Sequence, residues 1–155
     1  MIQRIQSLYL LLTALLSALL FSGSILNFTN NAGTTIQVTF SSLMKLSSGQ
    51  PPETVDRLIL LTVVLILIPL VALVVLLLFK KRAIQIKLTI LLIALVSFLI
   101  LACIHSSYLI MSKYPVSFIP GFRVFVPVLM LIFSILALRG IKKDDDLVKS
   151  YDRIR

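Results

Sequence analysis

Three long apolar runs constrain the fold of this chain more than any other feature of its sequence. Residues 8–26, 58–79 and 88–108 contain no charged side chain, and a span of the membrane hydrocarbon needs about 20 predominantly apolar residues. The chain as a whole is 59% hydrophobic and 14% charged, whereas soluble domains average about 45–50% apolar and about 25% charged residues. The sequence therefore predicts an integral membrane protein.

A fourth and shorter apolar run lies between Arg123 and Arg139. It covers only about 22 Å of a hydrocarbon core that is roughly 30 Å thick. We expect both arginines to extend toward the membrane surfaces, with Pro120 and Gly121 breaking the chain before the helix. The alternative is a span that starts earlier. The predicted fold class is all-α with four transmembrane helices in one domain, with spans at about 5–27, 57–79, 87–110 and 121–139 of residues 1–155.

The first apolar run also has some features of a signal peptide, because it opens the chain and follows a positive charge, Arg4. Its apolar stretch is longer than the usual h-region, and no A-x-A-like cleavage site follows it. The sequence therefore favours an uncleaved first helix over a signal peptide.

The distribution of positive charge predicts the orientation of the spans. Eleven of the 15 Lys and Arg residues lie before the first span, between the second and third, or after the fourth. Cytoplasmic segments carry the excess of Lys and Arg, so both termini are predicted to be cytoplasmic. Basic residues close to the spans attract anionic lipids. The residues predicted to lie at the membrane surface or on a partner are Arg4, Lys80, Lys81, Arg82 and Lys87.

The predicted outer loop, residues 28–55, contains one strand-like segment. Its stretch "TTIQVTF" alternates apolar and polar residues and is rich in Thr and Val, and "NNAG" before it is typical of a turn. A small two-stranded β flap over the bundle is one expectation. A disordered loop is the other.

Groups that carry out catalysis or bind metals are scarce in this sequence. All six Asp and Glu residues lie outside the predicted spans, and His105 is the single histidine. We therefore predict no catalytic residue, no metal site and no cofactor, and we expect the protein not to be an enzyme. Arg123 is the one charge that lies at a depth where a lipid phosphate or another anion would suit it. The competing interpretation is a side chain that simply reaches the membrane surface.

The tail, residues 141–155, carries nearly balanced charge. Such a sum makes it a poor anchor for anionic lipids or nucleic acid, so no nucleic-acid partner is predicted. An aspartate of residues 144–146 is expected to cap a short amphipathic helix, with Asp145 and Lys149 as a favourable i,i+4 pair. The residues predicted to dock on a partner form its apolar stripe and two adjacent charges: Leu147, Val148, Tyr151, Asp152, Arg153 and Ile154.

Three stretches resemble an uncharacterised four-helix inner-membrane protein family of Bacteroidetes, one of the families known as domains of unknown function. They are "MIQRIQSLYLLL", "FKKRAIQIKL" and "LALRGIKKDDDLVKSYDRIR". The resemblance covers nearly the whole chain and implies a multi-pass protein of the bacterial inner (cytoplasmic) membrane with its N- and C-termini inside. It implies no activity. It also directs attention to Gln3, Gln6 and Gln85, which are expected near the cytoplasmic face together with the tail.

The most distinctive segments are charged and cytoplasmic, whereas the bundle contains no reactive set of residues. The expected function is therefore that of a non-enzymatic accessory subunit in a larger inner-membrane assembly for secretion, insertion or envelope biogenesis. Its expected partners are other inner-membrane proteins, bound through the cytoplasmic face and the tail. The alternative is a small transporter, channel or lipid-handling protein that uses the helices kinked at Pro69 and Pro127, the outer loop and Arg123.

Overall fold

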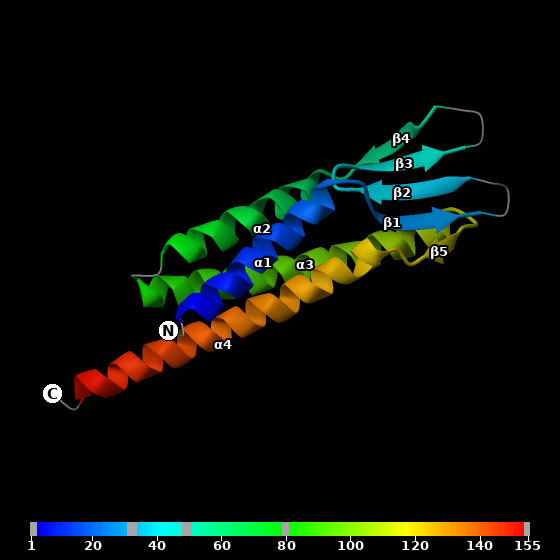
Figure 1. Cartoon of the computed structure of the whole chain (residues 1–155). Helices are drawn as coiled ribbons and strands as arrows, with labels where there is room; N and C mark the ends of the chain where they lie inside the picture. Colours follow the sequence, from blue (N-terminus) through cyan, green and yellow to red (C-terminus); the bar gives the residue numbers. More distant parts are fainter. Residues whose placement is uncertain (1–2, 31–33, 48–50, 79–80, 154–155) are drawn as a thin grey trace.

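Four helices form an antiparallel bundle that carries a β-sheet at one end (Figure 1). The computed structural model describes residues 3–30, 34–47, 51–78 and 81–153, without the side chains of residues 3–4 and 149–153. The helices are α1 (Gln3–Phe21), α2 (Ile59–Leu77), α3 (Arg82–Lys113) and α4 (Val126–Arg153). Both chain ends lie at the end of the bundle opposite the sheet (Figure 1). We call this the terminal end and the opposite one the sheet end.

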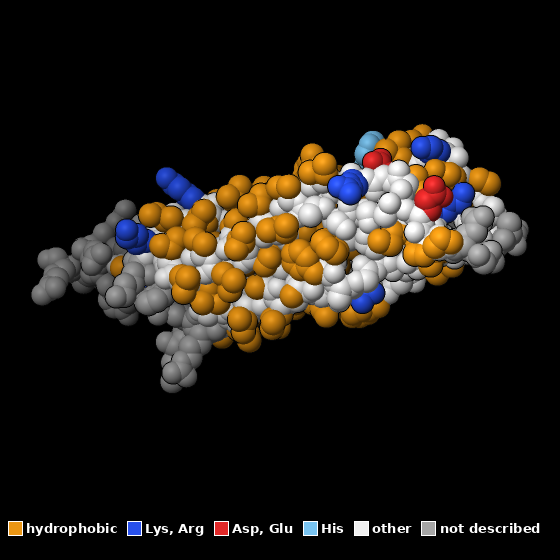
Figure 2. Space-filling view, turned by 90° about the horizontal axis from the view of Figure 1, so that it is seen from above, with side chains coloured by type: hydrophobic (Ala, Val, Ile, Leu, Met, Phe, Trp, Pro, Cys, Tyr) orange, Lys and Arg blue, Asp and Glu red, His pale blue; other side chains and the backbone are white. Residues whose placement is uncertain are grey.

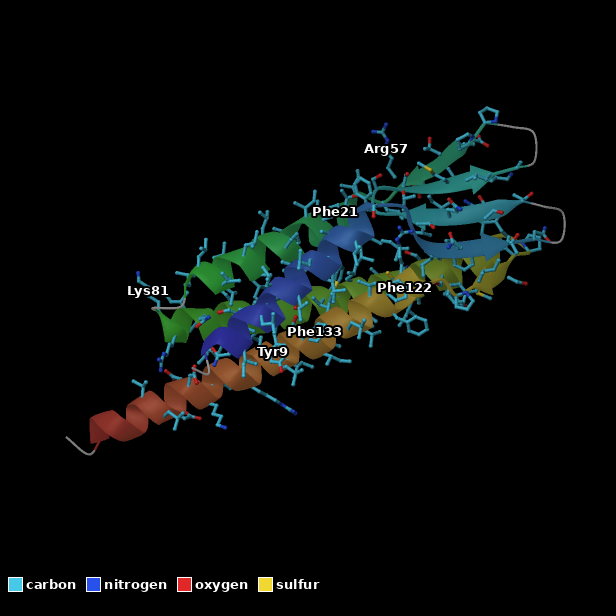
Figure 3. All side chains as sticks on the ribbon, viewed as in Figure 1. Tyr9, Phe21, Arg57, Lys81, Phe122 and Phe133 are labelled. Atoms are coloured by element: carbon cyan, nitrogen blue, oxygen red, sulfur yellow. The ribbon has the colours of Figure 1, made fainter. Side chains whose placement is uncertain are left out.

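Each helix packs against two others, so that the bundle has a closed square cross-section. α1 contacts α2 and α4, and α3 contacts the same two helices from the other side. Tyr9 of α1 and Phe133 of α4 stack with ring centroids 6.1 Å apart, and Figure 3 shows the two rings between these helices. The first and last helices of the chain are therefore direct neighbours.

α1 buries polar as well as apolar side chains and turns several of its leucines outward. Thr13 and Ser17 are fully buried, and each donates its hydroxyl to a carbonyl of its own helix, at 2.9 Å and 2.7 Å. A water-soluble helix has the opposite distribution, with an apolar stripe turned to the core. Outward leucines are typical of a helix surrounded by hydrocarbon. The exposed leucines of α1 are Leu8, Leu11, Leu15 and Leu19.

Three helices are long and apolar enough to cross a membrane. They comprise Ile59–Leu77, Arg82–Lys113 and Phe122–Val148, whereas the described apolar part of α1, Ile5–Phe21, is shorter. Apolar side chains cover the middle of the face seen in Figure 2, and the charged side chains visible there lie toward its two ends. The described part of the chain thus contains four helices, three of which meet the length of a span, and the crossing of a membrane by all four stays a prediction.

The sheet contains five antiparallel strands in the order β4-β3-β2-β1-β5. The strands are β1 (Ser24–Thr29), β2 (Thr35–Thr39), β3 (Ser42–Leu46), β4 (Glu53–Arg57) and β5 (Ser117–Ile119). The first four form a meander between α1 and α2, and β5 comes from the segment between α3 and α4. Phe28 and Phe118 are paired across β1 and β5, with ring centroids 5.5 Å apart.

The sheet is attached to the bundle mainly through one buried face and the end of α3. With 32 residues, α3 is about 48 Å long, and its last turns run beside the strands, where Leu109 and Ile110 share a pocket with Leu43 and Val55. The Thr62 hydroxyl of α2 donates to the Phe40 carbonyl at 2.9 Å, which ties a second helix to the sheet. The buried apolar residues of the sheet are Ile25, Leu26, Phe28, Ile36, Val38 and Leu43.

The predicted all-α class therefore needs correction. The stretch "TTIQVTF" does form a strand, β2, but its sheet has five strands instead of two. Strand β5 spans only three residues and pairs with β1 far away in sequence, so no local alternation indicates it. Of the predicted turn "NNAG", residues 31–33 lie outside the described residues.

The predicted separate helix in the tail was also wrong. α4 continues without interruption from Val126 to Arg153, so no aspartate caps a new helix. The predicted break before the fourth helix is present: Gly121 is extended and precedes a 3₁₀ turn, Phe122–Phe125 (η1), which leads into α4. α3 begins at Arg82, so most of the predicted basic connection is helical. α1 ends at Phe21, and the chain then turns into β1.

Gly23 makes the corner between α1 and β1, and it has a φ of +83°. We predict that Gly23→Ala lowers the free energy of unfolding by about 1–2 kcal/mol, because a side chain at this left-handed φ meets the backbone. Thermal unfolding in mild detergent measures the effect. Gly121→Ala is the matched control, since its φ is −92° and a Cβ there lies 3.5 Å from the Asn27 amide nitrogen. Equal melting temperatures for the two variants would contradict the prediction.

Candidate functional site

The terminal end of the bundle contains a cluster of polar side chains that joins all four helices. We call Gln6, Arg82, Gln85 and Asp144 the terminal cluster. Gln6, Gln85 and Asp144 are only 6%, 7% and 9% exposed. Buried polar groups are stable when they are hydrogen-bonded, so the partners of these side chains determine how the helices meet.

Three hydrogen bonds of the terminal cluster run between helices. Gln6 Nε2 donates to Asp144 Oδ2 at 2.7 Å, which joins α1 to α4. Arg82 Nη1 donates to the backbone oxygen of Asp144, also at 2.7 Å, which joins α3 to α4. Gln85 Nε2 donates to the Val75 oxygen at 3.2 Å and so joins α3 to α2. Asp144 thus accepts from two other helices at once, through its carboxylate and through its backbone.

Gly140 makes room for the first of these bonds. A Cβ built at this position would lie 2.7 Å from Gln6 Cγ, which is too close for the two atoms to coexist. Glycine is unfavourable within a helix by about 0.8–1.0 kcal/mol relative to alanine. Its presence one turn before Asp144 is explained by the close approach of the Gln6 side chain to α4.

Beyond the terminal cluster, α4 projects past the other helices (Figure 1). Because α1 runs antiparallel to α4 and Gln6 lies beside Asp144, the residues of α4 after Val148 extend beyond the described start of α1. Leu147 and Val148 are each 43% exposed. Tyr151, Asp152 and Arg153 belong to the last helical turns, but their side chains, and the whole of Ile154, lie outside the described part of the chain.

One side of α4 beside the terminal cluster is basic. Arg139, Lys142 and Lys143, together with Asp146 and Leu147, line an open depression of about 530 Å³ on α4. Asp144 lies on a different side of the helix, where it is buried against Gln6. Among these described residues, Asp144 is thus an inward carboxylate, whereas Arg139, Lys142, Lys143 and Asp146 share an outward, mainly basic side of α4.

The residues predicted to lie at the membrane surface differ in their surroundings. Lys81 is exposed at the turn before α3, where Figure 3 shows it pointing away from the bundle, and Lys87 is exposed on α3. Arg82 is half-buried and bonded to Asp144, so it connects helices. The side chain of Arg4 and the whole of Lys80 lie outside the described residues.

Arg123 lies at the sheet end, far along the molecule from the terminal cluster. Its guanidinium group sits over Gly23, where a built Cβ would be 2.6 Å from Nη1. Gly23 follows the C-terminus of α1, and a cation is favourable beside the partial negative charge of a helix C-terminus. Arg123 therefore has a structural role, in which its positive charge stabilises the C-terminus of α1. The predicted role in binding a lipid phosphate or another anion stays a prediction.

A family model described as a domain of unknown function, DUF4293, matches residues 2–154, which include every helix and strand of the fold. The chain belongs to the DUF4293 family. The predicted membership of a family of unknown function is thus confirmed, and its source in Bacteroidetes stays a prediction. A comparison with curated proteins gives no match. The family description names no activity, so the roles of residues here rest on the geometry alone.

Sequence reasoning pointed to part of the terminal cluster and missed the rest. The family resemblance directed attention to Gln6 and Gln85, and both are buried. The sequence predicted only that an aspartate of residues 144–146 caps a helix, although the spacing of four residues between Gly140 and Asp144 places both on one side of a helix. That spacing was the available signal, because a glycine within a helix lowers its stability and so suggests a close approach by another element on that side.

We predict that Gly140→Ala lowers the melting temperature in the natural background. The new methyl group displaces Gln6 and leaves the buried Asp144 carboxylate without that donor, a loss of about 1–3 kcal/mol that outweighs the gain in helix propensity. In a Gln6→Ala background the same change removes no hydrogen bond, so it should be neutral or stabilising. Thermal unfolding of the four proteins in mild detergent gives the coupling between the two positions. Equal effects in both backgrounds would contradict the role of Gly140.

Proposed function

We propose that the chain is a multi-pass protein of the bacterial inner membrane with both termini in the cytoplasm. Three of its helices have the length and hydropathy of membrane spans. α1 supports a fourth, because its described apolar part, the 17 residues Ile5–Phe21, extends about 26 Å and has four exposed leucines. The basic residues around the terminal cluster and the tail favour the cytoplasm for the terminal end.

Selective labelling of cysteines tests this orientation. In a Cys103→Ala background, Thr54→Cys places a thiol on the exposed strand β4 and Lys142→Cys places one on the exposed side of α4. We predict that a membrane-impermeant maleimide labels Cys at position 54 in spheroplasts, and labels position 142 only after the membrane is opened. The reverse pattern would overturn the orientation, and equal labelling of both positions would contradict membrane insertion.

Within this membrane we propose that the protein is a non-enzymatic accessory subunit of a larger assembly for secretion, insertion or envelope biogenesis. The observation that carries this proposal is the projection of α4 beyond the bundle, with Leu147 and Val148 exposed on it. A helix that binds the membrane surface lies in the plane of the interface. This one continues along the bundle and so leaves the membrane region, which favours a protein over a lipid as the partner of its apolar side.

The terminal cluster supports the proposal because it fixes the direction of the projecting helix. Asp144 is bonded to α1 and α3 at the point where α4 leaves the bundle. The docking residues therefore begin within one turn of a rigid attachment, and little conformational freedom is lost when a partner binds them. The basic side formed by Arg139, Lys142 and Lys143 lies next to the expected membrane surface, where anionic lipids would be its neighbours.

We predict that Leu147→Asp combined with Val148→Asp removes stoichiometric partners from the protein purified in mild detergent. Two charges on the apolar side prevent its burial against another protein. Quantitative mass spectrometry of the copurified proteins measures the loss, and truncation after Val148 should have a similar effect while retaining Asp144.

The matched control is Leu46→Asp combined with Val55→Asp, which places the same charges on apolar residues of 37% and 38% exposure at the sheet end. This control variant should retain the partners that copurify with the natural protein. A protein that purifies alone, or that loses its partners equally in both double variants, would contradict docking through the tail.

A lipid-handling function is the second candidate, and one observation favours it. An apolar groove of about 520 Å³ opens on the bundle near the sheet. Grooves of this size and composition accept small apolar ligands. The transporter and channel alternatives stay predictions.

A further inference from the structure

An apolar groove runs along α3 and α4 in the half of the bundle nearest the sheet. Its volume is about 520 Å³, and it is partly open to the surroundings. Along α3 it extends from Ile100 to Met111, and Val124 of η1 and Val128 of α4 form the opposite wall. Ile25 of β1 and Phe118 of β5 close it at the sheet end. The strand that sequence reasoning missed, β5, is thus part of the wall of this groove.

The lining of the groove is chemically close to hydrocarbon. Ser107 is a polar residue in the lining, and its hydroxyl donates to the Cys103 carbonyl of its own helix at 2.9 Å. A water molecule needs two to four polar partners to be stable in a cavity, and this wall does not offer them. The lining therefore suits an apolar ligand.

The dimensions of the groove select between two apolar occupants. From Ile100 to Met111 it extends about 17 Å along α3, and its volume is about 520 Å³. A transmembrane helix of a partner is about 10–12 Å across with its side chains, so that 17 Å of its length would fill roughly 1,600 Å³, about three times the volume of the groove. A single hydrocarbon chain fits, because its carbon atoms pack at about 3.5–4.0 Å from those of the wall.

In the proposed orientation the groove lies where the acyl chains of membrane lipids would reach it. Leu101 and Ile104, 63% and 61% exposed, lie on α3 at the same level and belong to the apolar surface that faces the membrane in the proposed orientation. We propose that the groove binds one acyl chain of a phospholipid from the leaflet on the sheet side. This inference rests on membrane insertion, and it is independent of docking through the tail.

Photolabelling with a phospholipid tests the proposal on the full chain. The protein is reconstituted in vesicles of phosphatidylethanolamine and phosphatidylglycerol that contain a phospholipid with a diazirine in its acyl chain. After irradiation, peptide mass spectrometry locates the label, and native mass spectrometry counts lipids retained in mild detergent. We expect one retained lipid per chain and labelling of the α3 and β5 segments that line the groove.

Cys103→Phe fills the groove, and it should reduce groove labelling and lipid retention at least fivefold. Leu101→Phe adds an aromatic ring at the same depth outside the groove, and it should leave both unchanged. Ser107→Leu fills the groove by a smaller amount from the next turn and should give an intermediate loss. Melting temperatures of the three variants show that each is folded.

Three results would overturn the binding of an acyl chain. They are equal labelling of the groove in Cys103→Phe and Leu101→Phe, labelling spread evenly over the apolar surface, and crosslinking of the groove to another protein in native membranes. Each of these leaves membrane insertion intact, because the apolar surface is still labelled. If the protein takes up no label anywhere, membrane insertion is contradicted as well. Failure of acyl-chain binding alone can therefore be distinguished from failure of both proposals.

Discussion

The hydrogen bond between Gln6 and Asp144 is the interaction on which the terminal end depends. It joins the first and last helices across 138 positions of sequence, in surroundings that expose only a few per cent of either residue. A buried carboxylate that lacks its donor is costly, so its neighbours are arranged to preserve this bond. Gly140 leaves space for Gln6, and Arg82 bonds the backbone of Asp144 from the other side. The direction of the projecting tail follows from these contacts.

The sheet end is built by a different kind of interaction. There the extra length of α3 passes beside the strands, and apolar side chains of β1, β2 and β3 are buried. Apolar packing is not directional, so it fills space without requiring a particular contact. It also leaves a groove where the sheet, α3 and α4 meet. Polar hydrogen bonds at the terminal end therefore fix the direction of α4, whereas the sheet end presents an apolar groove.

The helices could be predicted from the sequence because their signal is local. Runs of Leu, Ile and Val without charges indicate long apolar helices wherever they occur, and "TTIQVTF" indicates a strand through its alternation. The five-stranded sheet could not be predicted in the same way, because β5 is three residues long and lies in register with Phe28, 90 residues earlier in the chain. The predicted helix cap within residues 144–146 was wrong for a related reason. The local sequence does not distinguish a carboxylate that caps a helix from one that is buried within a helix, as Asp144 is.

By itself, the sequence determined the composition of the helices, the concentration of positive charge at the chain ends and in the 80–87 segment, and the membership of the DUF4293 family. These depend on residue type and order alone. Only the tertiary structure decided that α4 is continuous, that its charges separate into an inward carboxylate and a basic side, and that two loops combine into one sheet. The physical reason is that the last two of these features depend on contacts between distant residues. The cost of breaking such a contact is set by burial, and burial exists only after the helices have packed.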